Sequence, residues 1–143
     1  MNFWHESFRF SFVRNPWDRH VSCYHAFGDT DQLSFEDWIL SGSLIRHDFS
    51  LLFTGDIRPD ILNQSSFLLD RDGNDMTDFI GRFENLQEDF DTVCSIMNIL
   101  STDVGHLNRS EDRDYRTYYT SNKTKDLVAA KDRWVIDRFG YTF

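Results

Sequence analysis

Arg14, Arg19 and Ser22 are the side chains of this 143-residue sequence whose types and spacing suit the binding of an anion. Arg14 precedes an Asn-Pro pair, and steps of a helical turn place Arg19 and Ser22 along one line of a helix. Guanidinium and hydroxyl groups hold phosphate well, and a helix start adds backbone N–H groups and the positive end of its dipole. We therefore expect phosphate to bind through Arg14 and Ser22, with Arg19 either a secondary ligand or a surface residue.

A strand, a turn and a helix must position these side chains. Large apolar residues alternate with polar ones between residues 8 and 12, and this period of two predicts a strand that ends near Arg14. Asn15 is a favourable N-cap, and Pro16 fits the first helical position because its missing N–H is not needed there. The helix is expected to run to about Phe27. Its core face is expected to carry four residues: Trp17, Val21, Tyr24 and His25.

Each candidate also has a purely structural interpretation. Arg14 would then pair with a carboxylate such as Asp18, in an exposed pair worth at most about 1 kcal/mol. His20 and His25 lie in the same helix, where a lone histidine is more often a packing residue than a catalytic one. Glu111 opens a charge-rich run that is typical of a solvated face. The sequence therefore assigns no catalytic base.

Composition limits the classes of partner. Asp and Glu number 24 against 15 Lys and Arg, which gives a formal net charge of −9. Because such a surface repels polyanions, we expect neither nucleic acid nor an acidic membrane as a partner. A small anion can still bind, since a local cluster of arginines acts within a Debye length of about 8 Å. An apolar fraction of 40% and 14 Phe predict one folded domain over residues 1–143.

The sequence lacks the signals of a membrane anchor, of a disulfide and of a metal site. No run of about 18 apolar residues and no basic region followed by an apolar core is present, so we expect no membrane anchor in this chain and a cytoplasmic location. Cys23 and Cys94 fall in predicted helices among apolar neighbours, which favours two buried free thiols over a disulfide. No Cys and His spacing typical of a metal site occurs.

The remaining elements follow from periodicity and end signals. Ser34 is expected to begin a helix that ends near Leu40, and residues 44–53 to form loop and short helix. Residues 66–69 and 76–83 are predicted strands on either side of a tight turn. A helix beginning near Asn85 is expected to keep its apolar repeat as far as Leu100. A last helix, 121–139, should stop at Gly140.

The stretch Phe12–Tyr24, FVRNPWDRHVSCY, resembles the 3′-phosphate-binding motif of carbohydrate-type sulfotransferases, Phe-Val-Arg-Asn-Pro-x-x-Arg-x-Val-Ser-x-Tyr. Residues 78–90 and the tail from His106 to Phe143 look like later blocks of the same family, in the same order. The resemblance therefore spans nearly all of the chain. It implies that Arg14 and Ser22 hold the 3′-phosphate of 3′-phosphoadenosine 5′-phosphosulfate, the sulfate donor.

The resemblance also implies a fold and an activity. The fold would be α/β, a P-loop NTPase-type core with a small parallel sheet and a mostly helical surround. Full-length relatives transfer a sulfuryl group from the donor to a carbohydrate hydroxyl or amine. Animal members are anchored in the Golgi, so a Golgi or membrane-anchored origin stays open if the N-terminus of this chain is truncated. The loop with Asn108 and Ser110 would lie near the nucleotide, as a lid or adenosine contact, or form a plain turn.

One part of the family pattern is not found. The family's N-terminal strand, phosphate loop and helix carry a Lys that cradles the 5′-phosphosulfate, yet thirteen residues precede Arg14 and none of them is Gly or Lys. We therefore expect a core truncated at its first strand and helix. The chain would be a short relative, a product of a late start or a fragment.

This departure leaves alternatives to catalysis open. They are a non-catalytic nucleotide-binding remnant and an interaction domain that uses its exposed sheet edge. Loss of a central strand leaves such an edge, so a homodimer is expected, formed through residues 8–13 or the helix after Arg14.

Overall fold

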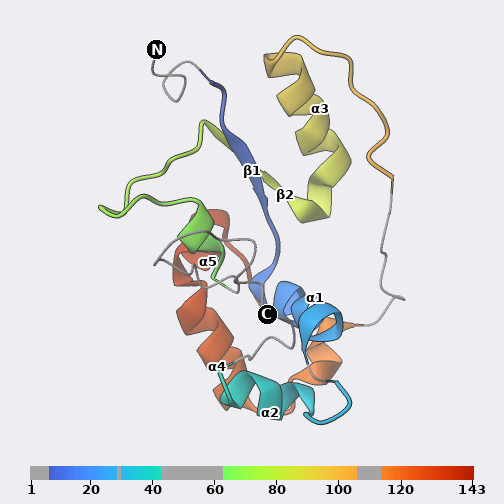
Figure 1. The fold of residues 1–143 in the computed structure, drawn as a ribbon, viewed down its shortest axis with the longest axis vertical. Coiled ribbons are helices and arrows are strands. Elements are labelled where there is room, and N and C mark those ends of the chain that lie inside the picture. The colour runs from blue at the N-terminus through green and yellow to red at the C-terminus, as the bar shows by residue number, and fades with distance from the viewer. Residues whose placement is uncertain (1–6, 29, 43–62, 106–113) are drawn as a thin grey trace. The chain divides into compact units, whose positions relative to one another are not determined.

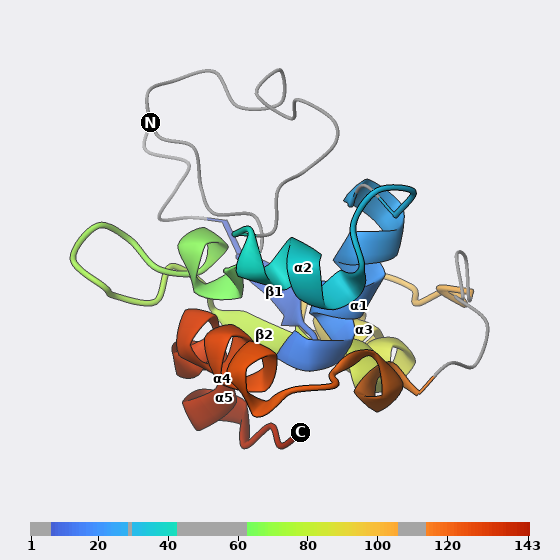
Figure 2. The ribbon, with the colours of Figure 1, turned by 90° about the horizontal axis from the view of Figure 1, so that it is seen from below.

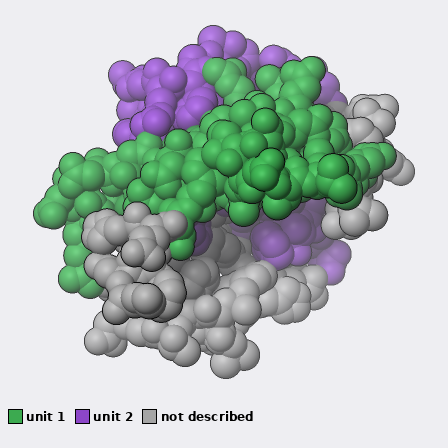
Figure 3. Space-filling model, turned by 90° about the horizontal axis from the view of Figure 1, so that it is seen from above, with its two compact units in different colours: residues 1–14, 68–109 green, residues 15–67, 110–143 purple. Residues whose placement is uncertain are grey.

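The computed structural model describes residues 7–28, 30–42, 63–105 and 114–143 (Figure 1). The chain forms two compact units, which Figure 3 colours separately. Unit 1 combines Met1–Arg14 with Leu68–Arg109, and unit 2 combines Asn15–Phe67 with Ser110–Phe143. Each unit is described by itself below.

Unit 1 contains a two-stranded parallel sheet and one long helix. The strands are β1 (Phe10–Val13) and β2 (Phe79–Arg82), and the register runs from Phe10 opposite Phe79 to Val13 opposite Arg82. A single 3-10 turn, η4 (Phe83–Asn85), leads from β2 into α3 (Leu86–Ile96) (Figure 1). The prediction of a strand before Arg14 and of a small parallel sheet is confirmed.

Two contacts fix how these strands meet. The Arg9 side chain donates from Nε to Asp78 Oδ2 at 3.0 Å and from Nη2 to Oδ1 at 2.8 Å, just before the ladder begins. Further along, the Phe12 ring covers Gly81 so closely that a Cβ there would lie 2.6 Å from Phe12 Cε1. Since no side chain fits in that space, glycine is required at this point of β2.

The segment before β2 differs from the expected strand pair. Residues Gln64–Phe67 form a 3-10 turn, η3, so the strand predicted at 66–69 is wrong. The physical reason is local: Asn63 Oδ1 accepts hydrogen bonds from the backbone N–H and the hydroxyl of Ser65, which favours a turn. Only an isolated antiparallel bridge between Leu69 and Asp75 remains, and β2 is shorter than the predicted 76–83.

Unit 2 is helical and holds a large aromatic core. Its helices are α1 (Pro16–Phe27), α2 (Phe35–Leu40), α4 (Asn122–Lys131) and α5 (Arg133–Phe139), with a 3-10 turn, η5 (Tyr115–Tyr118). Helices α1, α2 and α4 contact one another (Figure 2). The buried cluster between them comprises Trp17, Val21, Cys23, Tyr24, Phe35, Trp38, Ile39, Tyr119 and Val128.

The predicted start of α2 and the predicted end of α5 are both confirmed. The Ser34 hydroxyl accepts a hydrogen bond from Asp37 N at 3.2 Å, which confirms the expected start of α2. Gly140 ends α5 in the left-handed region at φ 65°, as expected. Residues 44–53, expected to be loop and short helix, lie outside the described residues.

The predicted single helix 121–139 is wrong, because two helices meet at Asp132. The Asp132 side chain is fully buried, and its Oδ1 accepts a hydrogen bond from Gln64 N at 2.9 Å. At φ −105° and ψ 28° its backbone departs from the helical region, so the helix is interrupted there. A distant residue thus decides this break.

The helix that begins after Asn85 also ends earlier than its apolar repeat predicts. Val93 and Cys94 are buried as expected, but α3 stops at Ile96, and Asn98 takes φ 54°. Leu100, expected on the apolar face, is 93% exposed.

Candidate functional site

The start of α1 is capped by its own asparagine. Asn15 Oδ1 accepts hydrogen bonds from Trp17 N at 3.0 Å and from Asp18 N at 3.3 Å, while Arg19 N donates to Asn15 O at 2.8 Å. Pro16, at the first helical position, has no N–H. The expectation that this helix start offers free N–H groups to an anion is therefore wrong, since the N–H groups of the first turn are occupied. An anion here depends on side chains and the helix dipole.

Arg14 ends the segment that contains β1 and lies against an aromatic ring of the same unit. Its guanidinium carbon is 4.6 Å from the centroid of the Phe83 ring, which η4 supplies directly after β2. A guanidinium over the face of a ring makes a cation–π contact, which favours one placement of the Arg14 side chain. Parallel pairing of β1 with β2 thus brings Phe83 to Arg14 and orients the guanidinium.

Arg19 and Ser22 lie on the partly exposed side of α1. The opposite side carries buried Trp17, Val21 and Tyr24, which confirms those core predictions. Ser22 is partly exposed, and among the described residues its hydroxyl has no hydrogen-bond partner. A hydroxyl in that state is able to donate a hydrogen bond to a bound oxyanion.

The boundary between the two units runs through this motif. Arg14 is the last residue of its segment in unit 1, and Asn15, Arg19 and Ser22 belong to unit 2. The structure therefore gives the local geometry on each side of the Arg14–Asn15 peptide bond. Asn108 and Ser110, expected near the nucleotide, lie outside the described residues. The phosphate-site assignment stays a prediction.

The two histidines of α1 have different surroundings. His20 is buried, with Nδ1 2.8 Å from Pro16 O, as expected of a packing residue. His25 was expected on the core face, but it is exposed, so that prediction is wrong. Its Nε2 lies 2.8 Å from Tyr118 Oη, and the two rings meet edge to face. His25 therefore lies at the surface beside η5, about ninety residues later in the chain.

The sequence did not predict the contacts between the start of α1 and residues 119–142. Asn15 Nδ2 donates to Thr142 O at 3.2 Å, and Trp17 Nε1 donates to Lys125 O at 3.1 Å. The Tyr119 hydroxyl donates to Trp17 O at 2.9 Å, and burial raises the pKa of Tyr119 far above its usual range. These bonds hold the start of α1 in place, yet they join residues too distant in sequence for any local pattern to reveal.

Cys23 and Cys94 are both buried free thiols, which confirms the prediction. In the described ranges, no three His, Cys, Asp or Glu side chains are grouped in a way that would hold a metal ion. None of the helices described is long and apolar enough to cross a membrane.

These features define an α/β protein in which the first described strand leads into a helix through an Arg-Asn-Pro corner. The model of the sulfotransferase family matches residues 2–138. The chain therefore belongs to the sulfotransferase family. Comparisons with curated proteins and with solved structures gave no match.

Proposed function

We propose that this sulfotransferase-family chain binds 3′-phosphoadenosine 5′-phosphosulfate through the 3′-phosphate, and that in full-length relatives the acceptor of the sulfuryl group is a carbohydrate hydroxyl or amine. The observation that carries the proposal is the Arg-Asn-Pro corner, where Arg14 is oriented by Phe83 and Ser22 follows two turns into α1. We further propose that the parallel sheet belongs to a P-loop NTPase-type core.

Each residue of the corner has a distinct role in this proposal. Arg14 supplies a charge-assisted hydrogen bond, Ser22 donates from its hydroxyl, and Arg19 adds positive potential one turn before Ser22. Asn15 holds the helix start, so its role is to position the others. Sulfuryl transfer by in-line attack also needs a base and a cation at the phosphosulfate, and neither is assigned to a described residue.

The test is calorimetric titration of 3′-phosphoadenosine 5′-phosphate into the wild type and Arg14→Ala. Loss of a hydrogen bond to a charged group costs about 1.5–3 kcal/mol, which is an affinity loss of roughly 10- to 150-fold. Ser22→Ala should lower the affinity less. Arg133→Ala is the matched control, because Arg133 forms an exposed pair with Asp137 within α5 and should bind as the wild type does.

A second ligand makes the test specific to the 3′-phosphate. Adenosine 5′-phosphate, which lacks that group, should bind much more weakly than the 3′,5′-diphosphate and should be insensitive to Arg14→Ala. Thermal unfolding of each variant confirms that it is folded. Equal affinity of wild type and Arg14→Ala for the diphosphate, or equal affinity of the wild type for both nucleotides, would overturn the assignment.

A further inference from the structure

Four large apolar side chains are exposed at the end of α3 and in the loop after it. We call Ile96, Met97, Ile99 and Leu100 the apolar tip. Their side chains are 53%, 45%, 54% and 93% exposed, respectively. Hydration of so much neighbouring apolar surface is unfavourable, and an exposed cluster of this kind is typical of an interaction site.

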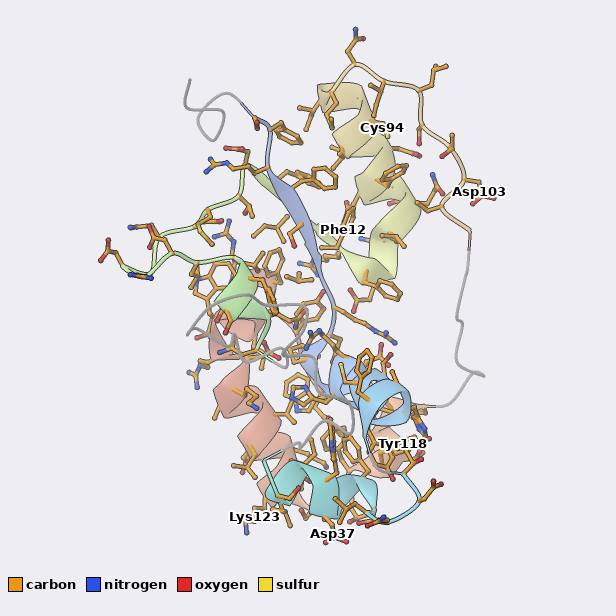
Figure 4. All side chains as sticks on the ribbon, viewed as in Figure 1. Phe12, Asp37, Cys94, Asp103, Tyr118 and Lys123 are labelled. Carbon is orange, nitrogen blue, oxygen red and sulfur yellow. The ribbon has the colours of Figure 1, made fainter. Side chains whose placement is uncertain are left out.

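The loop is held against α3 by a set of hydrogen bonds. Directly after the tip, the Ser101 hydroxyl donates to Asp91, and Gln87 Nε2 donates to Thr102 O at 3.2 Å. Val104 N then donates to Gln87 Oε1 at 3.0 Å. Figure 4 shows this loop running back alongside α3 past the labelled Asp103. These hydrogen bonds therefore fix the loop that carries the tip against α3.

The segment that carries the tip has acidic side chains as its only charged groups. Residues 83–105 contain five acidic side chains and no Lys or Arg, which gives this segment a charge of 0 − 5 = −5. The five are Glu84, Glu88, Asp89, Asp91 and Asp103. Hydrogen bonds from Ser101 and then Gln87 lower the pKa of the Asp91 carboxyl, so it stays ionised at neutral pH.

We propose that the apolar tip and the acidic surface of α3 together dock a basic amphipathic helix of a partner protein. Apolar residues of that helix would cover the tip, and its Lys and Arg would face the carboxylates. An anionic membrane would be repelled by the same carboxylates. A second copy is disfavoured as the occupant of the tip, because its own segment 83–105 carries the same five carboxylates and no Lys or Arg to face them. The proposal is independent of nucleotide binding.

The probe is a labelled 18-residue helical peptide with Leu on one face and Lys on the other, with binding followed by fluorescence anisotropy. A matched peptide with Glu in place of Lys should not bind. Leu100→Ser should weaken binding about tenfold or more, since it removes an apolar anchor. Leu127→Ser is the control, because Leu127 is a 44% exposed leucine of α4 in the other unit.

A second pair of variants tests the charge contribution. Asp103→Asn should weaken binding a few-fold, whereas Asp126→Asn in α4 removes the same charge from the other unit and should have little effect. Added salt should narrow the difference between Asp103→Asn and the wild type. Circular dichroism checks that each variant is folded.

Three results would overturn the proposal. One is equal affinity of wild type and Leu100→Ser for the Lys peptide. Another is binding of the wild type to phosphatidylserine vesicles in preference to the peptide. The third is a dimer that Leu100→Ser makes monomeric while peptide binding is unchanged, because the tip would then belong to a second copy.

Discussion

Asp78 shows how a single carboxylate secures the start of the parallel sheet. It accepts hydrogen bonds from the backbone N–H and the side chain of Arg9, and its own N–H donates to Arg9 O at 2.8 Å. These bonds to the Arg9 side chain and backbone lower the pKa of Asp78 from 3.8 to about 2. A carboxyl whose pKa is lower in the folded state stabilises the fold wherever it is ionised.

Asp78→Asn should therefore lower the melting temperature near neutral pH. The stabilisation is fully present above the unfolded-state pKa near 3.8 and is lost as the pH falls toward about 2. The difference in melting temperature between wild type and Asp78→Asn should be constant from pH 7 to about 5 and then shrink. Thermal unfolding at several pH values measures it, and Asp126→Asn is the comparison variant. A difference that grows with acidification would contradict this role of Asp78.

At the scale of elements, α1 is held at its start by one side chain with two functions. Asn15 Oδ1 caps the helix, while Nδ2 donates to Thr142 O and lies 3.4 Å from Tyr115 Oη. The cap also occupies the N–H groups that an anion would otherwise use. The same residue thus fixes the helix, and the proposed anion site would depend on the side chains of Arg14, Arg19 and Ser22.

Two substitutions at Asn15 should separate these functions. Asn15→Ala should cost about 0.5–2 kcal/mol of stability, because it removes the cap. Asn15→Asp keeps a capping oxygen and should cost less, but it adds a negative charge beside Arg14 and should weaken binding of the 3′,5′-diphosphate. Denaturant unfolding and calorimetry measure the two effects. Unchanged nucleotide affinity of Asn15→Asp would show that the anion does not approach this corner.

At the scale of the whole molecule, the sheet has open edges within the described part of the chain. Strands β1 and β2 each have a single neighbour there, and Phe10 on β1 is 41% exposed. Strands with an unpaired edge and apolar side chains associate readily, and two-fold pairing is the commonest closed form.

We therefore predict a homodimer that uses residues 8–13 or α1, the helix after Arg14. Light scattering over a range of concentrations should give a dimer for the wild type and a monomer for Phe10→Lys. Phe67→Lys is the control, because Phe67 is a similarly exposed ring outside the sheet, and this variant should remain dimeric. A wild type that stays monomeric at the highest concentration would contradict the prediction.

The catalytic competence of these 143 residues is a separate prediction. Neither Gly nor Lys occurs among the residues up to Arg14, so the chain by itself should transfer little or no sulfate. Loss of one preorganised donor commonly lowers a rate by about 10²–10³, and here a whole phosphate loop is not found. An assay with radiolabelled donor and a panel of sugars measures it. Robust turnover would show that another segment of this chain supplies the loop.

Features set by near neighbours in the sequence were predictable. The strand before Arg14, the cap at Asn15, the start of α2 at Ser34 and the stop at Gly140 depend on residues within one or two turns. Strand alternation, helix capping and a left-handed glycine at a helix end each depend on residues close together in the sequence. The sequence alone is therefore enough to predict them. The Arg14–Ser22 motif is local in the same way.

Only the tertiary structure decided features that join distant residues. The last helix is interrupted at Asp132, which accepts a hydrogen bond from Gln64 N. His25 lies at the surface in contact with Tyr118, and β1 pairs in parallel with a strand about seventy residues later. No periodicity encodes such contacts, because they depend on which buried polar groups and rings find one another when the chain folds. Leu100 is the clearest case: its place in a helical repeat predicted burial, but the hydrogen bonds of Ser101, Thr102 and Val104 to α3 hold the loop so that this leucine faces water.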